Sequence, residues 1–190
     1  MRPRLSAILS IGSCLLVIAV LSATTPDPAT RLRTYADASV GEWASTREFD
    51  LRVTEVAHGR VVQPADDYRD PLHSQAGYLV VSVDARSRSQ QNLILTTIEL
   101  STRDGRTIHP REEFVGQALP TVAPGFTGIG QYVFEIPDER LADARLIVGP
   151  PANAFAWYDV AARVDLGIDE PLSITATPIV ITESRSVVTR

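Results

Sequence analysis

The residues best suited to metal chemistry lie in one stretch between residues 64 and 76, PADDYRDPLHSQA. The candidate ligands there are Asp66, Asp67, Asp70 and His73. Carboxylates at this spacing bind calcium, and carboxylates combined with histidine bind zinc. The stretch lacks the D-x-D-x-D-G pattern of a calcium loop, and His58 and His73 lack zinc-finger spacing. The preferred interpretation is therefore a solvated acidic loop, with a metal or small-ligand site as the alternative.

A second polar group, His109 with Glu112 and Glu113, has the residue types of an acid and base pair. No nucleophile accompanies it, because the serines and threonines fall on predicted strands. The sequence contains no G-x-S-x-G, S-x-x-K or H-E-x-x-H motif. The glycine-rich stretch 124–130 precedes a predicted strand, so it does not predict a phosphate-binding loop. We therefore expect no enzymatic activity, no catalytic residues and no cofactor.

Aromatic residues suggest a different kind of site. Phe126 lies in the glycine-rich stretch, and Phe155, Trp157 and Tyr158 follow a pair of prolines. If these side chains gather at one end or edge of the domain, they form a contact patch for a protein partner. For Phe155 and Trp157 the preferred interpretation is burial in the core, where Trp43 is also a candidate, and the contact patch is the alternative.

The strand around which the rest of the domain is expected to pack is Gly77–Ala85, GYLVVSVDA. Its residues alternate between two faces, and β-branched side chains are frequent, as in a strand inside a sandwich. Further strands are predicted at 48–56, 60–63, 92–101, 107–109, 131–136, 145–148, 157–166 and 172–181. Because Pro178 interrupts the last of these, 172–181 is predicted to be an edge available for strand addition.

The connections between the strands are also predicted. Gly59 is expected to turn the chain, residues 64–76 to form a long loop, and Asp104-Gly105 to close a hairpin. Residues 110–119 should form a loop with one helical turn, and Asp138 should cap another turn. Short strands with no long helix predict an all-β, antiparallel immunoglobulin-like β-sandwich, with a small barrel as the alternative.

The N-terminus predicts membrane attachment. A short basic start is followed by Leu5–Ala23, which contains neither charge nor proline. Nineteen helical residues span about 28 Å, close to the thickness of the bilayer core. The stretch is typical of an uncleaved signal anchor, with a cleavable signal ending at Ala23 or lipidation at Cys14 as alternatives. Arg2 and Arg4 place the N-terminus in the cytoplasm and the following domain outside it.

Charge and cysteine content exclude one class of partner and one kind of covalent link. All 18 basic residues are arginines; without Arg2 and Arg4, 16 remain against 23 acidic residues, a formal charge of −7. Such a domain repels phosphate backbones, so nucleic acid is not an expected partner. Cys14 is the only cysteine, which excludes an intrachain disulfide. The predicted divisions are a transmembrane helix at 1–23, a tether at 24–36, a β-sandwich at 37–182 and a frayed tail at 183–190.

Several short motifs occur in an order that resembles a known family. They are Val53–Val56, Gly77–Val83, Asp104–Arg106, Pro124-Gly125 and Val133–Pro137. The chain resembles a bacterial, actinobacterial-type family of secreted or membrane-tethered immunoglobulin-like domains of unknown function. It departs from the family after the central strand, where Ala85-Arg86-Ser87 stands in place of a frequent asparagine. The resemblance implies an extracytoplasmic location and contact with a protein or ligand, and it supplies no catalytic residues.

These observations predict a single-pass membrane protein whose outer domain is a non-catalytic interaction or accessory module for another envelope protein. The alternative is a small-ligand or metal-binding domain that uses the loop from Asp66 to His73.

Overall fold

The computed structural model describes residues 34–64, 69–150, 160–169 and 177–189. The chain divides into two compact units, Met1–Leu32 and Arg33–Arg190, and every described residue belongs to the second. The predicted membrane segment at 1–23 thus lies outside the described residues. Within the described part, no helix has both the length and the apolar character needed to cross a bilayer.

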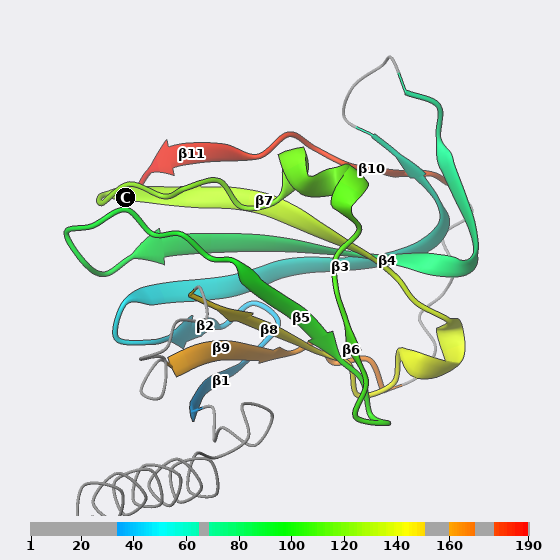
Figure 1. Cartoon of the computed structure of the whole chain (residues 1–190), viewed down its shortest axis with the longest axis horizontal. Coiled ribbons are helices and arrows are strands. Elements are labelled where there is room, and N and C mark those ends of the chain that lie inside the picture. The colour runs from blue at the N-terminus through cyan, green and yellow to red at the C-terminus, as the bar shows by residue number, and fades with distance from the viewer. Residues whose placement is uncertain (1–33, 65–68, 151–159, 170–176, 190) are drawn as a thin grey trace, which may run out of the picture. The chain divides into compact units, whose positions relative to one another are not determined.

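Two β-sheets form a sandwich (Figure 1). One sheet contains, in spatial order, β1 (Thr34–Ser39), β9 (Val160–Asp165), β8 (Arg145–Gly149), β5 (Thr97–Ser101) and β6 (Thr107–Ile108). The other contains β10 (Ile179–Val180), β3 (Phe49–Gln63), β4 (Leu72–Ser87), β7 (Phe126–Glu135) and β11 (Arg185–Val188), and β2 (Trp43–Ser45) also pairs with β3. Two short 3-10 helices, η2 (Glu112–Gln117) and η3 (Asp138–Arg140), lie in the connections.

Most neighbouring strands are antiparallel, so the predicted all-β antiparallel sandwich is confirmed. Two pairs differ, because β1 is parallel to β9 and β10 is parallel to β3. Both parallel pairs involve edge strands that reach their neighbours after long connections, as parallel pairing requires.

The predicted central strand is confirmed as β4, which lies between β3 and β7. Its inward side chains, Leu79, Val81, Val83 and Ala85, are fully buried in the core between the sheets. The alternate residues point the other way, and Tyr78 and Val80 belong to a second apolar cluster. At that end of β4, both faces of the strand are therefore covered.

The second cluster explains where η2 and β10 pack. It joins Val62, Tyr78, Val80, Phe114, Val133 and Ile181. Phe114 comes from η2, and Ile181 directly follows β10. These two segments thus cover the outer face of the six-stranded sheet, and their apolar residues fix them there.

The prediction of a turn at Gly59 is wrong. β3 continues through this glycine to Gln63, and the pairing with β4 shows register shifts between Val53 and Glu55 and between Gly59 and Val61. Between the pairs Gly59–Tyr78 and Val61–His73, the extra residues lie on β4, at 74–77, so β3 passes Gly59 without a turn. Because β4 begins at Leu72, the expected loop at 64–76 is also shorter than predicted.

Other boundaries also differ from expectation. Residues 185–188, expected in a frayed tail, form β11 against β7, and β1 begins inside the expected tether. The strand expected at 92–101 is confined to β5, and Leu93 instead makes an isolated bridge with Val122. The Asp104-Gly105 hairpin between β5 and β6 is confirmed, with Gly105 at a φ of +76°.

Asp138 does not cap η3 as predicted. The N-cap is Pro137 and makes no side-chain hydrogen bond to the helix. The Asp138 carboxylate instead accepts a 2.5 Å hydrogen bond from Arg60, and it lies 3.2 Å from Nε2 of the fully buried His58. Gly77 passes directly over His58 with a φ of +104°. This contact joins β3, β4 and η3 at one end of the sandwich.

We expect Gly77→Ala to lower the free energy of unfolding by about 2–4 kcal/mol. A Cβ at Gly77 would lie 2.7 Å from His58 Nε2, and its φ is unfavourable for alanine. Gly41→Ala is the matched control, because Gly41 has a φ of +89° but no atom within 4 Å of the added Cβ. Urea unfolding of both variants separates backbone strain from the close contact. Equal losses in the two variants would show that the contact with His58 carries no cost.

Candidate functional site

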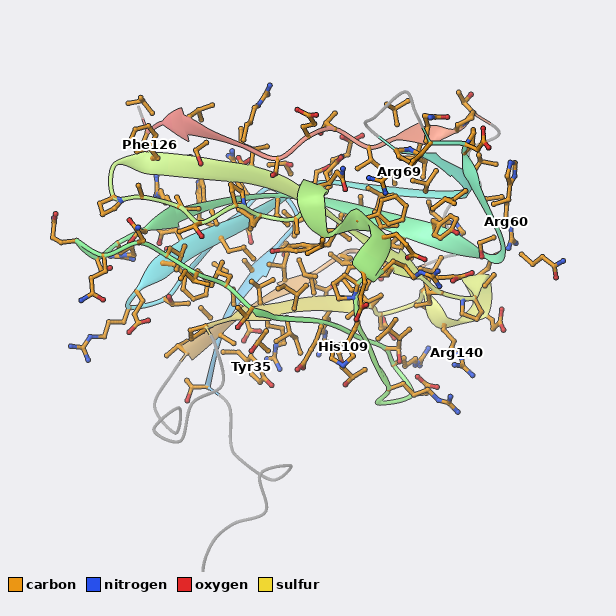
Figure 2. The ribbon with its side chains drawn as sticks, turned by 45° about the horizontal axis from the view of Figure 1, so that its top comes forward. Tyr35, Arg60, Arg69, His109, Phe126 and Arg140 are labelled. Atoms are coloured by element: carbon orange, nitrogen blue, oxygen red, sulfur yellow. The ribbon has the colours of Figure 1, made fainter. Side chains whose placement is uncertain are left out.

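The edge strand β11 is exposed along its whole length. Among the described strands it pairs with β7 alone, and all four of its residues are exposed. Val188 lies directly opposite Phe126, so the two side chains share one face of the sheet. Val188 is 68% exposed and Phe126 38%. Figure 2 shows Phe126 at the end of β7 beside β11. We call Phe126 and Arg185–Val188 together the β11 edge.

The β11 edge contains features that promote strand pairing. It carries no proline and no lysine, the residues that commonly protect edge strands. Val187 and Val188 are β-branched and exposed. The strand is anchored beyond its end, where the Thr189 N–H donates to the Gly125 carbonyl at 2.9 Å. A fixed edge with apolar side chains can accept a further strand through backbone hydrogen bonds.

A pocket of about 220 Å³ lies beside η2, between β5 of one sheet and β7 of the other. Apolar side chains including Ile98, Phe114 and Val133 line it, and His109 and Glu112 contribute polar groups. We call this the η2 pocket. Tyr132 also lines it, and burial raises the pKa of its phenol while a hydrogen bond with the backbone of Leu119 opposes that rise.

The η2 pocket is positioned where the segment that follows η2 packs closely against β7. A Cβ at Gly130 would lie 2.6 Å from the backbone nitrogen of Leu119, so only glycine fits there. At Gly128, a Cβ would similarly meet the side chain of Val122 at 2.5 Å. Gly128 and Gly130 lie within β7, where they admit a crossing chain. Their role in this structure is close packing.

The His109 group is only partly assembled as an acid and base pair. His109 and Glu112 line the same pocket, whereas Glu113 forms two hydrogen bonds with Arg111, at 2.7 and 2.9 Å. The hydrogen bond from Arg111 holds the pKa of Glu113 below its ordinary value. Arg111 also donates to Glu135 at 2.7 Å. Glu113 is thus engaged in an ion pair, and only Glu112 faces the pocket without one among the described residues.

Trp43 lies on the outer face of the six-stranded sheet, which corrects the expectation that it fills the core. The register of β2 turns Ala44 into the core, so Trp43 points outward. The guanidinium carbons of Arg52 and Arg86 lie 4.7 and 4.4 Å from the centre of its ring. This arrangement is a double cation–π contact, and it leaves Trp43 half-buried.

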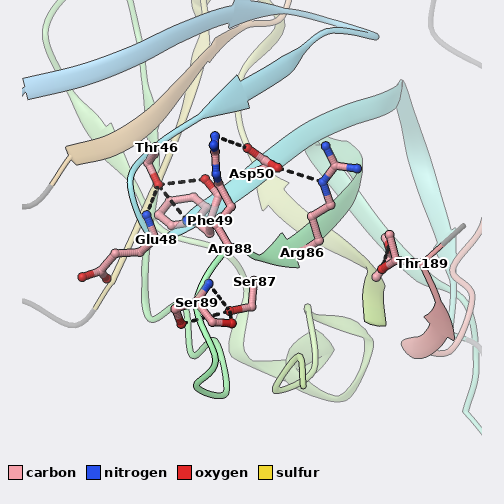
Figure 3. A network of polar contacts seen from close by, with 10 residues as sticks. Thr46, Glu48, Phe49, Asp50, Arg86, Ser87, Arg88, Ser89 and Thr189 are labelled. Carbon is pink, nitrogen blue, oxygen red and sulfur yellow. Dashed lines mark hydrogen bonds and ion pairs between the residues drawn. The ribbon is translucent and has the colours of Figure 1, made fainter. Parts of the chain in front are cut away.

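Acidic partners hold these arginines in place. Arg52 pairs with Asp84 at 2.6 Å, and Arg86 with Asp50 at 2.8 Å. Asp50 also accepts from Arg88 at 3.2 Å, as Figure 3 shows. Although Asp50 is only 5% exposed, its carboxylate is thus satisfied by two arginines. Both carboxylates of this network are paired with arginines, which indicates a structural role.

A polar hollow of about 440 Å³ lies beside β1, β8 and β9. Four of its five charged residues pair with one another: Arg163 contacts Asp37 at 2.5 Å, and Arg145 contacts Asp165 at 3.7 Å. The fifth, Glu42, accepts a hydrogen bond from the Ser39 N–H at 3.1 Å. The hydrogen bond from Arg163 lowers the pKa of Asp37. Tyr35, labelled in Figure 2, stacks on Arg163 at 4.4 Å. This internal pairing leaves little unsatisfied charge for a ligand.

The remaining predicted site residues divide into two groups. Phe155, Trp157, Tyr158, Asp66 and Asp67 lie outside the described residues. Asp70 and His73 are described, and no cluster of three or more His, Cys, Asp or Glu side chains suited to a metal occurs in the described ranges. The predicted gathering of Phe126 with the other aromatic residues therefore stays a prediction.

Sequence reasoning found Phe126, His109 and Glu112, but it predicted neither the β11 edge nor the η2 pocket as a whole. The β11 edge fell in the expected frayed tail, although the paired valines at 187 and 188 were a signal for a strand. Ile98, Phe114 and Val133 are far apart in the chain, and only their packing brings them to one pocket. A single sequence contains no direct signal for such a pocket.

No protein-family model and no curated protein matches the sequence. Among solved structures, the chain is similar to the yjhA protein from Bacillus subtilis, with a TM-score of 0.51 and 16% identity over 67% of this chain and 98% of that one. It also aligns with an uncharacterized β-sandwich protein from Clostridium difficile 630, with a TM-score of 0.42 and 16% identity over 72% of this chain and 99% of that one. At this identity, the likeness to the Bacillus protein concerns the fold alone.

We expect Asp50→Asn to destabilise the domain by about 1–3 kcal/mol at pH 7 and to reduce its loss of stability in acid. Burial acts to raise the pKa of Asp50, but hydrogen bonds from Ser45 and Arg86 and the charges of Arg86 and Arg88 lower it overall. The network therefore contributes stability above the unfolded-state pKa of about 3.9 and loses it as the pH falls through the lower folded-state pKa.

Urea unfolding from pH 7 to pH 2 measures this effect. Glu139→Gln is the control, because Glu139 is exposed and makes no ion pair within the described ranges. If the unfolding free energy of Asp50→Asn falls with decreasing pH in parallel with that of the native chain, Asp50 does not contribute to the acid sensitivity.

Proposed function

We propose that this chain is a non-catalytic binding module of the cell envelope. In this proposal, residues 1–23 anchor an immunoglobulin-like β-sandwich outside the cytoplasmic membrane. The sandwich then binds an extended segment of another envelope protein by strand addition at the β11 edge. The observation that carries the proposal is the exposure of β11, which has β7 as its single partner within the described ranges and presents Val187 and Val188.

Strand addition fits β11 better than β10, the edge favoured by the sequence. β10 comprises two residues, whereas β11 comprises four. β11 is also antiparallel to its neighbour, and its last residue lies opposite a partly exposed Phe126. Backbone groups of an added strand supply affinity, and side chains against Phe126 and Val188 supply specificity. The expected partner segment is therefore extended and carries at least one apolar residue.

The location rests on the sequence. The uncharged stretch Leu5–Ala23 and the preceding arginines support a single-pass anchor with an external C-terminal domain. The resemblance to bacterial membrane-tethered immunoglobulin-like domains supports the same location and the immunoglobulin-like topology. The formal charge of −7 without Arg2 and Arg4 supports a protein partner over a nucleic acid.

We expect Val188→Lys to weaken binding of the partner segment about tenfold, which corresponds to about 1.4 kcal/mol. A lysine on an edge strand opposes pairing because its charge would be buried by the added strand. The partner is first identified by photo-crosslinking in native membranes, with a photoreactive residue at position 187 of the full-length chain. A peptide with the crosslinked sequence is then titrated against the purified full-length chain, with hydrogen exchange of the β11 amides as a second readout.

Val180→Lys is the matched control, because Val180 is 62% exposed on the opposite edge strand and Val188 is 68% exposed on β11. This variant should bind the peptide as the native chain does. The proposal fails if both variants lose affinity equally, or if the peptide binds without protecting the β11 amides from exchange.

A second prediction concerns membrane topology. Asn92→Cys places a thiol on an exposed loop of the domain, and the only natural cysteine, Cys14, lies in the predicted membrane segment. A membrane-impermeant maleimide should label this variant on intact cells from which any outer barrier has been removed, and it should leave the native chain unlabelled. Labelling only after lysis would place the domain on the cytoplasmic side.

A further inference from the structure

The η2 pocket is a separate candidate for a binding site. Its volume of about 220 Å³ is smaller than the roughly 300–1,000 Å³ of pockets for drug-sized ligands. A ligand of fragment size, such as one ring or a short alkyl chain, matches this volume. Ile98, Phe114, Ala118 and Val133 provide apolar surface for its body. In Figure 2, His109 lies on the same side of the sandwich as η2.

The polar groups beside the apolar surface are largely satisfied by the protein itself. Gln131 donates to Ser82 at 3.0 Å and accepts from the Thr182 N–H at 2.7 Å. The Tyr132 phenol hydrogen-bonds to the backbone of Leu119. A ligand therefore meets few unsatisfied hydrogen-bonding groups inside the pocket, and recognition of a polar group falls to the exposed residues at its mouth.

The charge around η2 is negative. Arg111 pairs with Glu113 and Glu135, and the guanidinium of Arg69 donates to the Glu113 carbonyl at 3.3 Å. Glu112 adds a third carboxylate, which makes no ion pair among the described residues, so these five side chains sum to −1. The same field acts on nearby Tyr78, where burial first and the charge of Glu135 second raise the pKa of the phenol.

We propose that the η2 pocket binds a small organic cation, an alkyl or aryl amine. Its apolar body contacts Phe114 and Ile98, and its ammonium group pairs with Glu112. Anions are disfavoured by the local charge of −1, and a neutral ligand makes no ion pair with Glu112. This site is distinct from the β11 edge and does not depend on strand addition there.

The test uses the full-length chain in an uncharged detergent and three probes of similar shape. These are benzylamine, benzyl alcohol and benzoate, each titrated calorimetrically and corrected for heats with empty micelles. Benzylamine should bind saturably with one site per chain. Benzyl alcohol should bind at least fivefold more weakly, and benzoate should show no saturable binding.

Three variants locate the site. Glu112→Gln removes the carboxylate and should weaken benzylamine binding about fivefold to tenfold, without changing the affinity for benzyl alcohol. Thr96→Trp places a large side chain at the exposed mouth of the pocket and should abolish binding of both probes. Glu139→Gln, on the other 3-10 helix, is the matched control and should bind benzylamine as the native chain does. Thermal unfolding establishes that each variant is folded.

Several results would overturn the proposal: equal affinities for the amine and the alcohol, an unchanged affinity in Glu112→Gln, or benzylamine binding that persists in Thr96→Trp. Absence of saturable binding by the native chain would also overturn it. Val188→Lys separates this proposal from strand addition, since it should leave benzylamine binding intact whatever its effect on the partner peptide.

Discussion

The pairing of β4 with β3 on one side and β7 on the other is the interaction on which the rest of the described structure depends. β4 contributes Leu79, Val81 and Val83 to the core between the sheets. Its alternate residues Tyr78 and Val80 contribute to the cluster on the opposite face. Burial of apolar surface on both sides, at roughly 25 cal/mol per Å², makes this three-stranded unit the stable part of the domain.

The short elements at the periphery are positioned by contacts with this unit. η2 is held by Phe114, which is buried in the second cluster, and by the hydrogen bond from the Arg111 N–H to the Val133 carbonyl. β11 is held by pairing with the first half of β7. Neither element is long enough to be stable by itself, so their positions follow from the strands beneath them.

Much of the fold could be predicted because β-strands with one buried face have a simple sequence period. The alternation in 77–85 and 48–56 identified β4 and the first part of β3. The continuation of β3 through Gly59 was missed because a glycine can mark a turn or lie within a strand, and only the pairing with β4 decides between them. Trp43 was misplaced because its three-residue strand is too short to define which face is buried.

The candidate surfaces were less predictable, for different physical reasons. His109 and Glu112 were noticed for their chemistry, but the apolar lining of their pocket depends on how β5, η2 and β7 pack. Asp138 shows the same limitation. Its position predicts a helix cap, whereas tertiary contacts direct its carboxylate to Arg60 and toward His58. Local sequence indicates which contacts a side chain can make, and the packing of the surrounding strands decides which of them it makes.

β7 connects the two proposed surfaces. Its first half, Phe126–Ile129, pairs with β11, and its second half contributes Gln131, Tyr132 and Val133 to the η2 pocket. Coupling between the surfaces would require β7 to shift when either is occupied. β7 is paired with β4 from Glu135 down to Thr127 and is packed against Leu119 at Gly130, so such a shift would break both contacts. Since a closely packed strand transmits little motion without a second stable arrangement, the two surfaces should act independently.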